Sequence, residues 1–239
     1  MENGQSSAST LIVNGKSHLP TDEQLIEIGN SHIATSFETP LRPDAFELSD
    51  DEKIEKIEHH FRSILEIIGL DLTDDSLRGT PKRVAKMYIK EIFKGLNPAN
   101  FPSATLFENK FGYNEMLVEK DISVYSFCEH HFLPIVGKAH VAYISSGDVI
   151  GLSKINRIVD YFSRRPQVQE RLTIQIAEAL KKVLNTDDVA VLIESKHFCV
   201  AARGAQDINS TTITSEYSGA FTNEATKAEF LQYVSNDLS

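Results

Sequence analysis

Residues 116–143 read MLVEKDISVYSFCEHHFLPIVGKAHVAY. Apolar and polar residues alternate before the central CEHH, from Met116 to Val124, and again after it, from Ala139 to Tyr143. A period of two is typical of strands that bury one face. We therefore predict two strands here. Side chains three apart on a strand face opposite sides, so the segment between Cys128 and His131 must turn if both are to reach one point.

Apolar residues at helical spacing lie on either side of these strands. They recur every three or four positions in residues 54–68, and Pro166 separates two further stripes. Thr80 before Pro81 is typical of a helix cap followed by proline, and Gly95 is expected to end that helix. The predicted helices cover residues 49–69, 80–95, 153–162, 168–183 and 224 onward, and further strands cover 189–203 and 210–217.

This order of elements predicts an α+β fold, in which long helices cover one face of an antiparallel sheet and a pair of helices precedes it. Residues 1–48 are rich in Ser, Asn, Thr and acidic groups without a sustained period, so we expect a mobile N-terminal arm. Residues 49–98 form the expected N-terminal helical region. Residues 99–239 form the expected main domain.

The bulk composition limits the class of protein. At 239 residues the chain is long enough for one sizeable core with an appended arm. Its net charge of −10 disfavours a general nucleic-acid surface, because binding phosphates requires clustered Lys and Arg. No apolar run is long enough to span a bilayer, and the first twenty residues lack a basic stretch followed by an apolar one. We therefore expect no membrane association, no signal peptide and a cytoplasmic protein.

The chain has two cysteines, and each lies close to histidines. Cys128 precedes His130 and His131, and Cys199 follows His197. Zinc favours thiolate and imidazole ligands, and a catalytic zinc ion usually keeps three protein ligands and one water. We predict a three-ligand zinc site built from Cys128, His131 and Cys199.

Other interpretations of these residues stay open. The cysteines can be buried thiols of a reducing compartment, where disulfides are rare. Spacing also allows a four-ligand structural zinc site, with His130 or His197 as the fourth ligand. If residues 189–203 are one strand, Arg203 returns to the face that His197 and Cys199 share.

A zinc nucleoside deaminase is disfavoured because the motifs H-x-E and P-C-x-x-C are absent. A P-loop is disfavoured because the motif G-x-x-x-x-G-K-[ST] is absent.

Basic residues occupy the first turns of two predicted helices. Ser153 is placed to cap the helix that carries Lys154 and Arg157, and Lys82 and Arg83 begin an earlier helix. A basic residue there opposes the helix dipole and costs a few tenths to about 1 kcal/mol. Such positions favour an anion site, since free N–H groups at helix starts bind phosphates. The alternative is two solvated basic pairs.

Gln169 and Glu170 lie in the first turn of the helix after Pro166. A carboxylate there suits the helix dipole, which is a sufficient explanation for Glu170. A functional role for the pair requires a ligand with adjacent N–H donors, such as the pyrimidine edge of guanine.

Together these motifs resemble the type I GTP cyclohydrolases over about residues 50–235. The matching stretches are TPKRVA (80–85), CEHH (128–131), GLSKINR (151–157), RPQVQERL (165–172) and HFCVAARG (197–204). The resemblance implies the tunnelling fold for residues 99–239, which become the catalytic domain. It also implies a decamer of two pentamers in which subunits share each active site.

The resemblance implies a role for each candidate residue. The zinc ligands fall on Cys128, His131 and Cys199. The catalytic residues fall on His130, His197 and Ser153, of which Ser153 contacts the ribose. The guanine-reading pair falls on Gln169 and Glu170. The triphosphate contacts fall on Lys154, Arg157, Arg203 and Arg83, and Arg83 is expected to act in a neighbour's site.

The implied reaction is the zinc-dependent hydrolysis of GTP to 7,8-dihydroneopterin triphosphate with release of formate, at the entry to folate or biopterin synthesis. Zinc makes hydroxide available near neutral pH for attack on C8 of guanine. We expect His130 to protonate a ring nitrogen as general acid, with His197 and Ser153 assisting the ring-opening and sugar steps.

Two alternatives to this enzyme are disfavoured. A silent scaffold that keeps zinc is disfavoured because His130, Ser153, Glu170 and Arg203 are all present. A related pterin or deazapurine enzyme of the same fold is disfavoured by the complete set of zinc ligands.

Overall fold

The computed structural model describes residues 11–13, 16–18 and 38–236. The chain divides into two units, residues 1–35 and 36–239, which are described separately. In the first unit, β1 (Leu11–Val13) pairs antiparallel with β2 (Lys16–His18). The predicted mobile arm of residues 1–48 falls mostly outside the described residues and stays a prediction.

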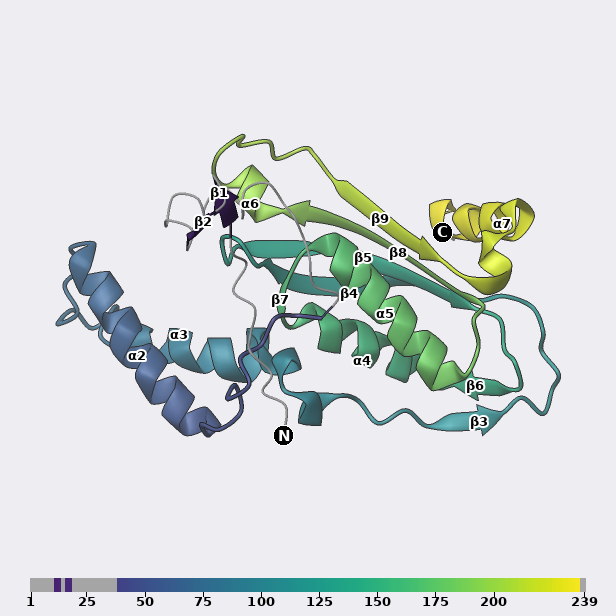
Figure 1. Cartoon of the computed structure of the whole chain (residues 1–239), viewed down its shortest axis with the longest axis horizontal. Coiled ribbons are helices and arrows are strands. Elements are labelled where there is room, and N and C mark those ends of the chain that lie inside the picture. Colours follow the sequence, from purple (N-terminus) through teal and green to yellow (C-terminus); the bar gives the residue numbers. More distant parts are fainter. Residues whose placement is uncertain (1–10, 14–15, 19–37, 237–239) are drawn as a thin grey trace. The chain divides into compact units, whose positions relative to one another are not determined.

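The second unit is built on a five-stranded sheet in the order β7-β4-β5-β8-β9. Neighbouring strands run antiparallel, except that β7 lies parallel to β4. β3 and β6 form a separate antiparallel pair (Figure 1). The strands are β3 (Leu106–Glu108), β4 (Leu117–Cys128), β5 (Pro134–Tyr143), β6 (Asp148–Ile150), β7 (Pro166–Gln167), β8 (Val189–His197) and β9 (Thr212–Tyr217).

α4 (Leu152–Ser163) and α5 (Gln169–Leu184) cover one face of this sheet (Figure 1). Their apolar stripes, which include Ile155 and Leu180, are buried against sheet residues such as Val191. Burying one such aliphatic side chain contributes about 1.5–3 kcal/mol. The two stripes that the sequence predicts on either side of residue 166 are thus the core-facing sides of α4 and α5. The α+β class is confirmed.

The opposite face of the sheet is partly covered by the C-terminal helix, α7 (Glu224–Ser235). Phe230 of α7 and Phe221 just before it pack against Ala190 and Leu192 of β8. Neighbouring residues of β8 belong to the core under α4 and α5, so this strand is buried on both faces. The sequence predicts helices on one face only. The second covered face is not apparent from β8, because a strand that is buried on both faces loses the period-two alternation that marks a single buried side.

Two helices precede the sheet. α2 (Asp50–Ile67) begins with a capping box, in which Ser49 Oγ accepts from the Glu52 N–H (3.3 Å) and the Glu52 carboxylate accepts from the Ser49 N–H (2.8 Å). α3 (Thr80–Met87) passes into a π-helical turn over residues 88–92, so the helix predicted as far as residue 95 is interrupted. None of the helices in residues 38–236 combines the length and apolar character that crossing a bilayer requires.

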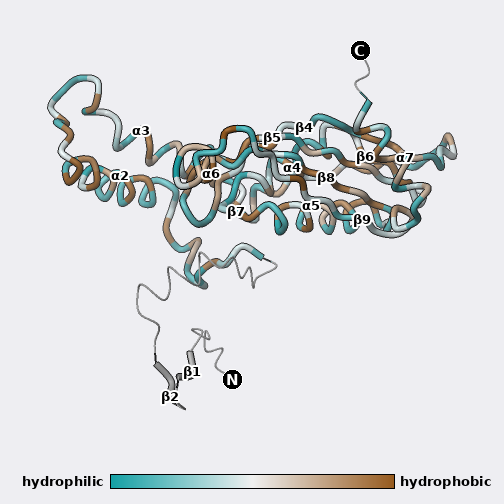
Figure 2. The backbone as a smooth tube through the Cα atoms, turned by 90° about the horizontal axis from the view of Figure 1, so that it is seen from above, coloured by the Kyte–Doolittle hydropathy of each residue, from teal (hydrophilic) through white to brown (hydrophobic). Residues whose placement is uncertain are grey.

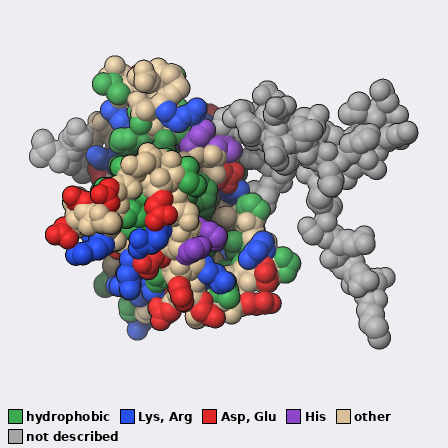
Figure 3. Space-filling model, turned by 90° about the vertical axis from the view of Figure 1, so that its left-hand side faces the viewer, with side chains coloured by type: hydrophobic (Ala, Val, Ile, Leu, Met, Phe, Trp, Pro, Cys, Tyr) green, Lys and Arg blue, Asp and Glu red, His purple; other side chains and the backbone are tan. Residues whose placement is uncertain are grey.

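Part of the predicted apolar stripe of α2 is exposed in the single subunit. Hydrophobic and hydrophilic residues alternate around the helix (Figure 2), yet only Ile54 and Leu65 are buried, while Ile64 and Ile68 are 50% and 65% exposed. Figure 3 views the end of the second unit that carries α2 and α3, where acidic, basic and histidine side chains are interspersed. Apolar surface left in water on a folded subunit is typical of a face that another chain covers.

The starts of two helices differ from prediction. Gly79, not Thr80, is the cap of α3, and Gly151, not Ser153, is the cap of α4. The chain leaves β6 at Ile150 and turns directly into α4, where the Gly151 carbonyl accepts from the Lys154 N–H at 2.7 Å. The position of a cap thus depends on where the preceding element ends, which residue preference alone does not reveal.

The strand predicted over residues 189–203 ends at His197, and the short helix α6 (Phe198–Ala201) follows. His197 pairs with Ile135 at the start of β5, and beyond it neither β5 nor β9 offers a partner. The backbone bonds locally instead, with the Ala202 N–H donating to the Phe198 carbonyl at 2.8 Å. The prediction that His197, Cys199 and Arg203 share one strand face is therefore wrong.

Candidate active site and metal centre

The turn between β4 and β5 carries the first part of the site. Cys128 is the last residue of β4, and its N–H donates to the Leu133 carbonyl at 2.8 Å. The Phe132 N–H returns to the Cys128 carbonyl at 2.8 Å, and Phe132 adopts a φ of +52° that the tight turn requires. The predicted turn between Cys128 and His131 is confirmed. It leaves Cys128 buried and His131 exposed.

Pairing of β5 with β8 brings the second part of the site to this turn. Because His197 lies opposite Ile135, the end of β8 meets the beginning of β5. α6 then carries Cys199 back toward Cys128 and His131, and the ligand atoms of these three residues all lie within 4.8 Å of one another. Zinc–ligand distances of about 2.0–2.3 Å require only small movements of such side chains.

The chemistry of this donor set fits a cation. Burial, followed by the neighbouring Cys128 thiol, raises the pKa of Cys199 to about 11. The Cys199 thiol therefore resists ionisation when no cation is bound beside it. A bound cation reverses this effect because it stabilises the thiolates. Cys128, His131 and Cys199 can together hold a metal ion.

Two further histidines flank the three ligand residues. His130 lies with Nδ1 3.7 Å from Cys128 Sγ and Nε2 3.9 Å from Glu129 Oε1. His197 lies with Nε2 2.7 Å from Gln169 Oε1. Burial lowers the pKa of His197, and the negative charge of Glu170 partly opposes that shift. His197 is therefore a neutral imidazole over most of the physiological range.

Gln169 and Glu170 begin α5, as predicted, but their side chains differ in environment. Gln169 is 1% exposed, and its Nε2 donates to the carbonyls of Ile193 (3.1 Å) and Thr212 (3.0 Å). Glu170 is exposed, and its charge acts on His197. The contact of Gln169 with guanine stays a prediction, and within residues 38–236 both ends of its amide already have partners.

The predicted basic residues are not all in one place. Arg203 reaches the ligand residues, with Nη1 2.6 Å from His131 Nε2. Arg83 bonds locally on α3, to Thr80 Oγ1 (2.8 Å) and the Ser76 carbonyl (3.0 Å). These contacts do not connect α3 with the metal centre.

Ser153, Lys154 and Arg157 belong to the first half of α4, which starts at the other end of the sheet from the metal centre. β5 runs from the metal centre at Pro134 to Tyr143, and β6 and α4 follow from there (Figure 1). α4 then runs back about 18 Å along the sheet. One subunit thus assembles the metal ligands, both histidines, residues 169–170 and Arg203, but separates them from the start of α4.

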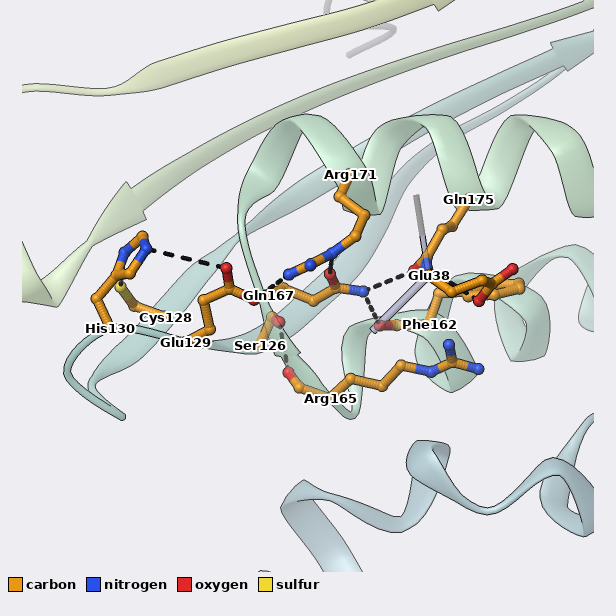
Figure 4. Close-up of polar contacts among 10 residues, drawn as sticks. All are labelled: Glu38, Ser126, Cys128, Glu129, His130, Phe162, Arg165, Gln167, Arg171 and Gln175. Atoms are coloured by element: carbon orange, nitrogen blue, oxygen red, sulfur yellow. Dashed lines mark hydrogen bonds and ion pairs between the residues drawn. The ribbon is translucent and has the colours of Figure 1, made fainter. Parts of the chain in front are cut away.

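A largely buried row of polar side chains, to which the sequence-based predictions give no role, lies beside the metal centre. Figure 4 shows this row, in which Glu129 contacts Arg171, Arg171 contacts Gln167, and Gln167 contacts Gln175. The last three residues are spaced by four and lie on one side of α5 and its approach. Polar residues at helical spacing between apolar ones are the signal that could have revealed the row.

Comparisons with known proteins identify the family of this chain. The sequence model of the family described as GTP cyclohydrolase I matches residues 57–235. A protein of Flavobacterium johnsoniae named GTP cyclohydrolase 1 is 60% identical over 216 residues, which cover 90% of this chain and 97% of the relative. Proteins of the same name from Vibrio parahaemolyticus (58% identical; 81% of this chain, 89% of the relative) and Aeromonas salmonicida (57%; 83% and 90%) are also similar. This chain, an enzyme by that relationship, belongs to the GTP cyclohydrolase I family.

Proposed function

We propose that this protein catalyses the zinc-dependent hydrolysis and rearrangement of GTP to 7,8-dihydroneopterin triphosphate, with release of formate. The observation that carries the proposal is the group of Cys128, His131 and Cys199, whose ligand atoms lie within 4.8 Å of one another, with His130 beside Cys128 and His197 at the start of the helix that carries Cys199. The names of the similar proteins support GTP as substrate. The product makes this the first step of tetrahydrofolate or biopterin synthesis, and we place it in the cytoplasm.

Cys128, His131 and Cys199 are the residues that would hold zinc. When bound, zinc supplies a Lewis acid that lowers the pKa of water from 15.7 toward about 7. Three protein ligands are typical of catalytic zinc, whereas structural sites usually have four. His197 contacts Gln169, which favours the catalytic type.

The two histidines move protons at defined atoms. Gln169 Nε2 donates to two carbonyls, so its Oε1 must be the acceptor that faces His197. The proton of neutral His197 therefore sits on Nε2, and Nδ1 keeps a lone pair that can accept a proton. We assign the general acid that protonates the guanine ring to His130, and assistance in the ring-opening and sugar steps to His197 and Ser153.

The substrate contacts require more than one subunit. Glu170, with Gln169 behind it, would read guanine, and Arg203 would bind the triphosphate near the metal. Lys154, Arg157 and Arg83 lie elsewhere on the subunit, and their predicted phosphate contacts fit a site completed by neighbouring copies. The exposed apolar side of α2 supports such an assembly. We propose the tunnelling fold and a decamer of two pentamers, as the resemblance to the family implies.

The proposed function has a direct test. Purified protein incubated with GTP should yield a pteridine that fluoresces after oxidation, together with formate. Removing the metal with a chelator should abolish the product, and adding zinc back should restore it. Product formation that persists after the metal has been shown to leave the protein would contradict the proposed mechanism.

Replacing Glu170 with alanine should lower kcat/KM for GTP by at least roughly a hundredfold, because two N–H donors of the base edge would lose a charged acceptor worth about 1.5–3 kcal/mol each. Inosine triphosphate lacks the exocyclic amine, so the variant should also discriminate less between GTP and this analogue. Steady-state kinetics with both nucleotides measure this. Glu178→Ala, on the same helix, is the matched control, and near-normal kinetics of Glu170→Ala would remove Glu170 from the guanine contact.

A further inference from the structure

Glu129 stands in the sequence between Cys128 and His130, which both belong to the proposed site, although the proposed reaction assigns Glu129 no role. Its Oε1 is 3.9 Å from His130 Nε2, and its Oε2 contacts the Arg171 guanidinium. The other ring nitrogen of His130, Nδ1, lies 3.7 Å from Cys128 Sγ. The imidazole is thus placed between the carboxylate and a metal ligand, with Nδ1 on the side of the metal centre (Figure 4).

Arg171 is held rigidly on the far side of Glu129. Its side chain is 5% exposed, and its Nε donates to Gln167 Oε1 at 3.1 Å. Gln167 is itself fully buried and donates from Nε2 to the Phe162 carbonyl (3.0 Å) and to Gln175 Oε1 (2.9 Å). Each polar group in this row therefore fixes the next, and the row ends at His130.

The backbone adds a second connection. The Glu129 N–H donates to the Gln167 carbonyl at 3.0 Å, where β7 lies parallel to the end of β4. The same residue, Gln167, thus holds the main chain of Glu129 directly and its carboxylate through Arg171. A residue anchored at both points can set the direction of a neighbouring side chain.

Stability alone does not account for an ion pair with a buried arginine at this place. Burying a guanidinium and a carboxylate costs hydration free energy, and well-packed apolar residues often replace such pairs without loss. The apolar residues next along α5, Leu172 and Ile176, are fully buried in the core. The distinguishing feature of the pair is its contact with His130.

We infer that Glu129 is a positioning residue for His130, and that Arg171 and Gln167 hold Glu129 in the required place. The carboxylate lies 3.9 Å from Nε2 and attracts the Nε2–H edge of the ring electrostatically, which directs Nδ1 toward the metal centre, in the way that a carboxylate behind a histidine orients the ring in other metal and catalytic sites. The inference rests on the proposed function, because it concerns the residue assigned as general acid.

The test compares the single variant Glu129→Leu with the paired variant Glu129→Leu/Arg171→Gln, whose new amide keeps an N–H donor for Gln167. The single variant leaves Arg171 unpaired and should lower both Tm and kcat. The paired variant should recover Tm, because no buried charge remains, yet kcat should stay about 10- to 100-fold low. KM for GTP and the bound zinc per subunit should match the wild type in both.

Two results would overturn the inference. Recovery of kcat together with Tm in the paired variant would mean that Glu129 only neutralises Arg171. Loss of zinc in step with kcat would mean that the row supports the metal ligands instead of His130. The absorption spectrum of the Co²⁺-substituted protein provides a check of the ligand geometry that does not depend on activity.

Two additional variants complete the design. Glu129→Gln keeps an oxygen acceptor of the same reach, so it should retain more kcat than Glu129→Leu, and equal kcat values in the two would overturn the inference. Glu178→Leu/Lys181→Gln removes another ion pair from α5 and should leave kcat unchanged. Wild-type protein that forms no pteridine would overturn the proposed function and this inference with it, whereas wild-type turnover with full kcat in the paired variant would overturn the inference alone.

Discussion

Replacing Cys199 with serine should abolish zinc binding and lower pteridine formation from GTP by roughly a thousandfold or more, since metal catalysis contributes several kcal/mol and each 1.36 kcal/mol is tenfold. A serine hydroxyl stays protonated where a cysteine bound to zinc ionises, so the ion would keep only two of its three protein donors. Metal content by a chromogenic chelator and turnover by fluorescence measure the two effects.

The same variant distinguishes a catalytic from a structural metal. Cys199 lies on the surface helix α6 and not in the main core, so the Cys199→Ser protein should keep its far-ultraviolet circular dichroism and most of its thermal stability. Val200→Ser introduces the same hydroxyl one position later and serves as the control, with zinc and turnover both retained. A Cys199→Ser protein that still binds one zinc ion per subunit and turns over normally would contradict the assignment of this ligand.

The second large effect is expected at the two histidines beside the metal. His130→Ala and His197→Ala should each lower kcat by roughly 10²–10⁴-fold, the usual contribution of a general acid or base, while zinc content stays at the wild-type level. The zinc content of these variants distinguishes a three-ligand catalytic site from a four-ligand structural site. A structural site with either histidine as the fourth ligand would lose its metal in the corresponding variant.

Single-turnover experiments separate the roles of these histidines. If His130 protonates the guanine ring and His197 assists later steps, the two variants should accumulate different intermediates, resolved by rapid quenching and chromatography. Accumulation of the same intermediate in both would remove the basis for separate roles. His59→Ala, at an exposed histidine of α2, is the control and should behave as wild type.

Several features of the fold could be derived from the order of residues alone. Alternation from Met116 to Val124 and from Ala139 to Tyr143 predicts β4 and β5, and the apolar stripes on either side of Pro166 predict α4 and α5. These predictions succeed because the period of burial reports which side of an element faces a core. The turn at CEHH follows from the requirement that two potential ligands meet.

Boundaries could not be derived in the same way. Nothing local in residues 198–203 ends a strand, and β8 ends at His197 because its neighbours have run out. Gly151 replaces Ser153 as the cap of α4 because β6 ends one residue earlier. Such limits are set by partner strands distant in the chain, so residue preference carries no information about them.

The sequence by itself determined which chemical groups this protein can bring to a reaction. These are two thiols and three histidines in two short motifs, with a carboxylate and basic residues at helix starts. Only the tertiary structure decided which of these groups meet. Antiparallel pairing of β5 with β8 joins Cys128 and His131 to Cys199, whereas the path through β6 takes Ser153 and Lys154 to the other end of the sheet. The contact of Glu129 with Arg171 likewise depends on the pairing of β7 with the end of β4, which brings the start of α5 beside Glu129, because proximity in space is produced by long-range pairing and packing, which spacing along the chain does not encode.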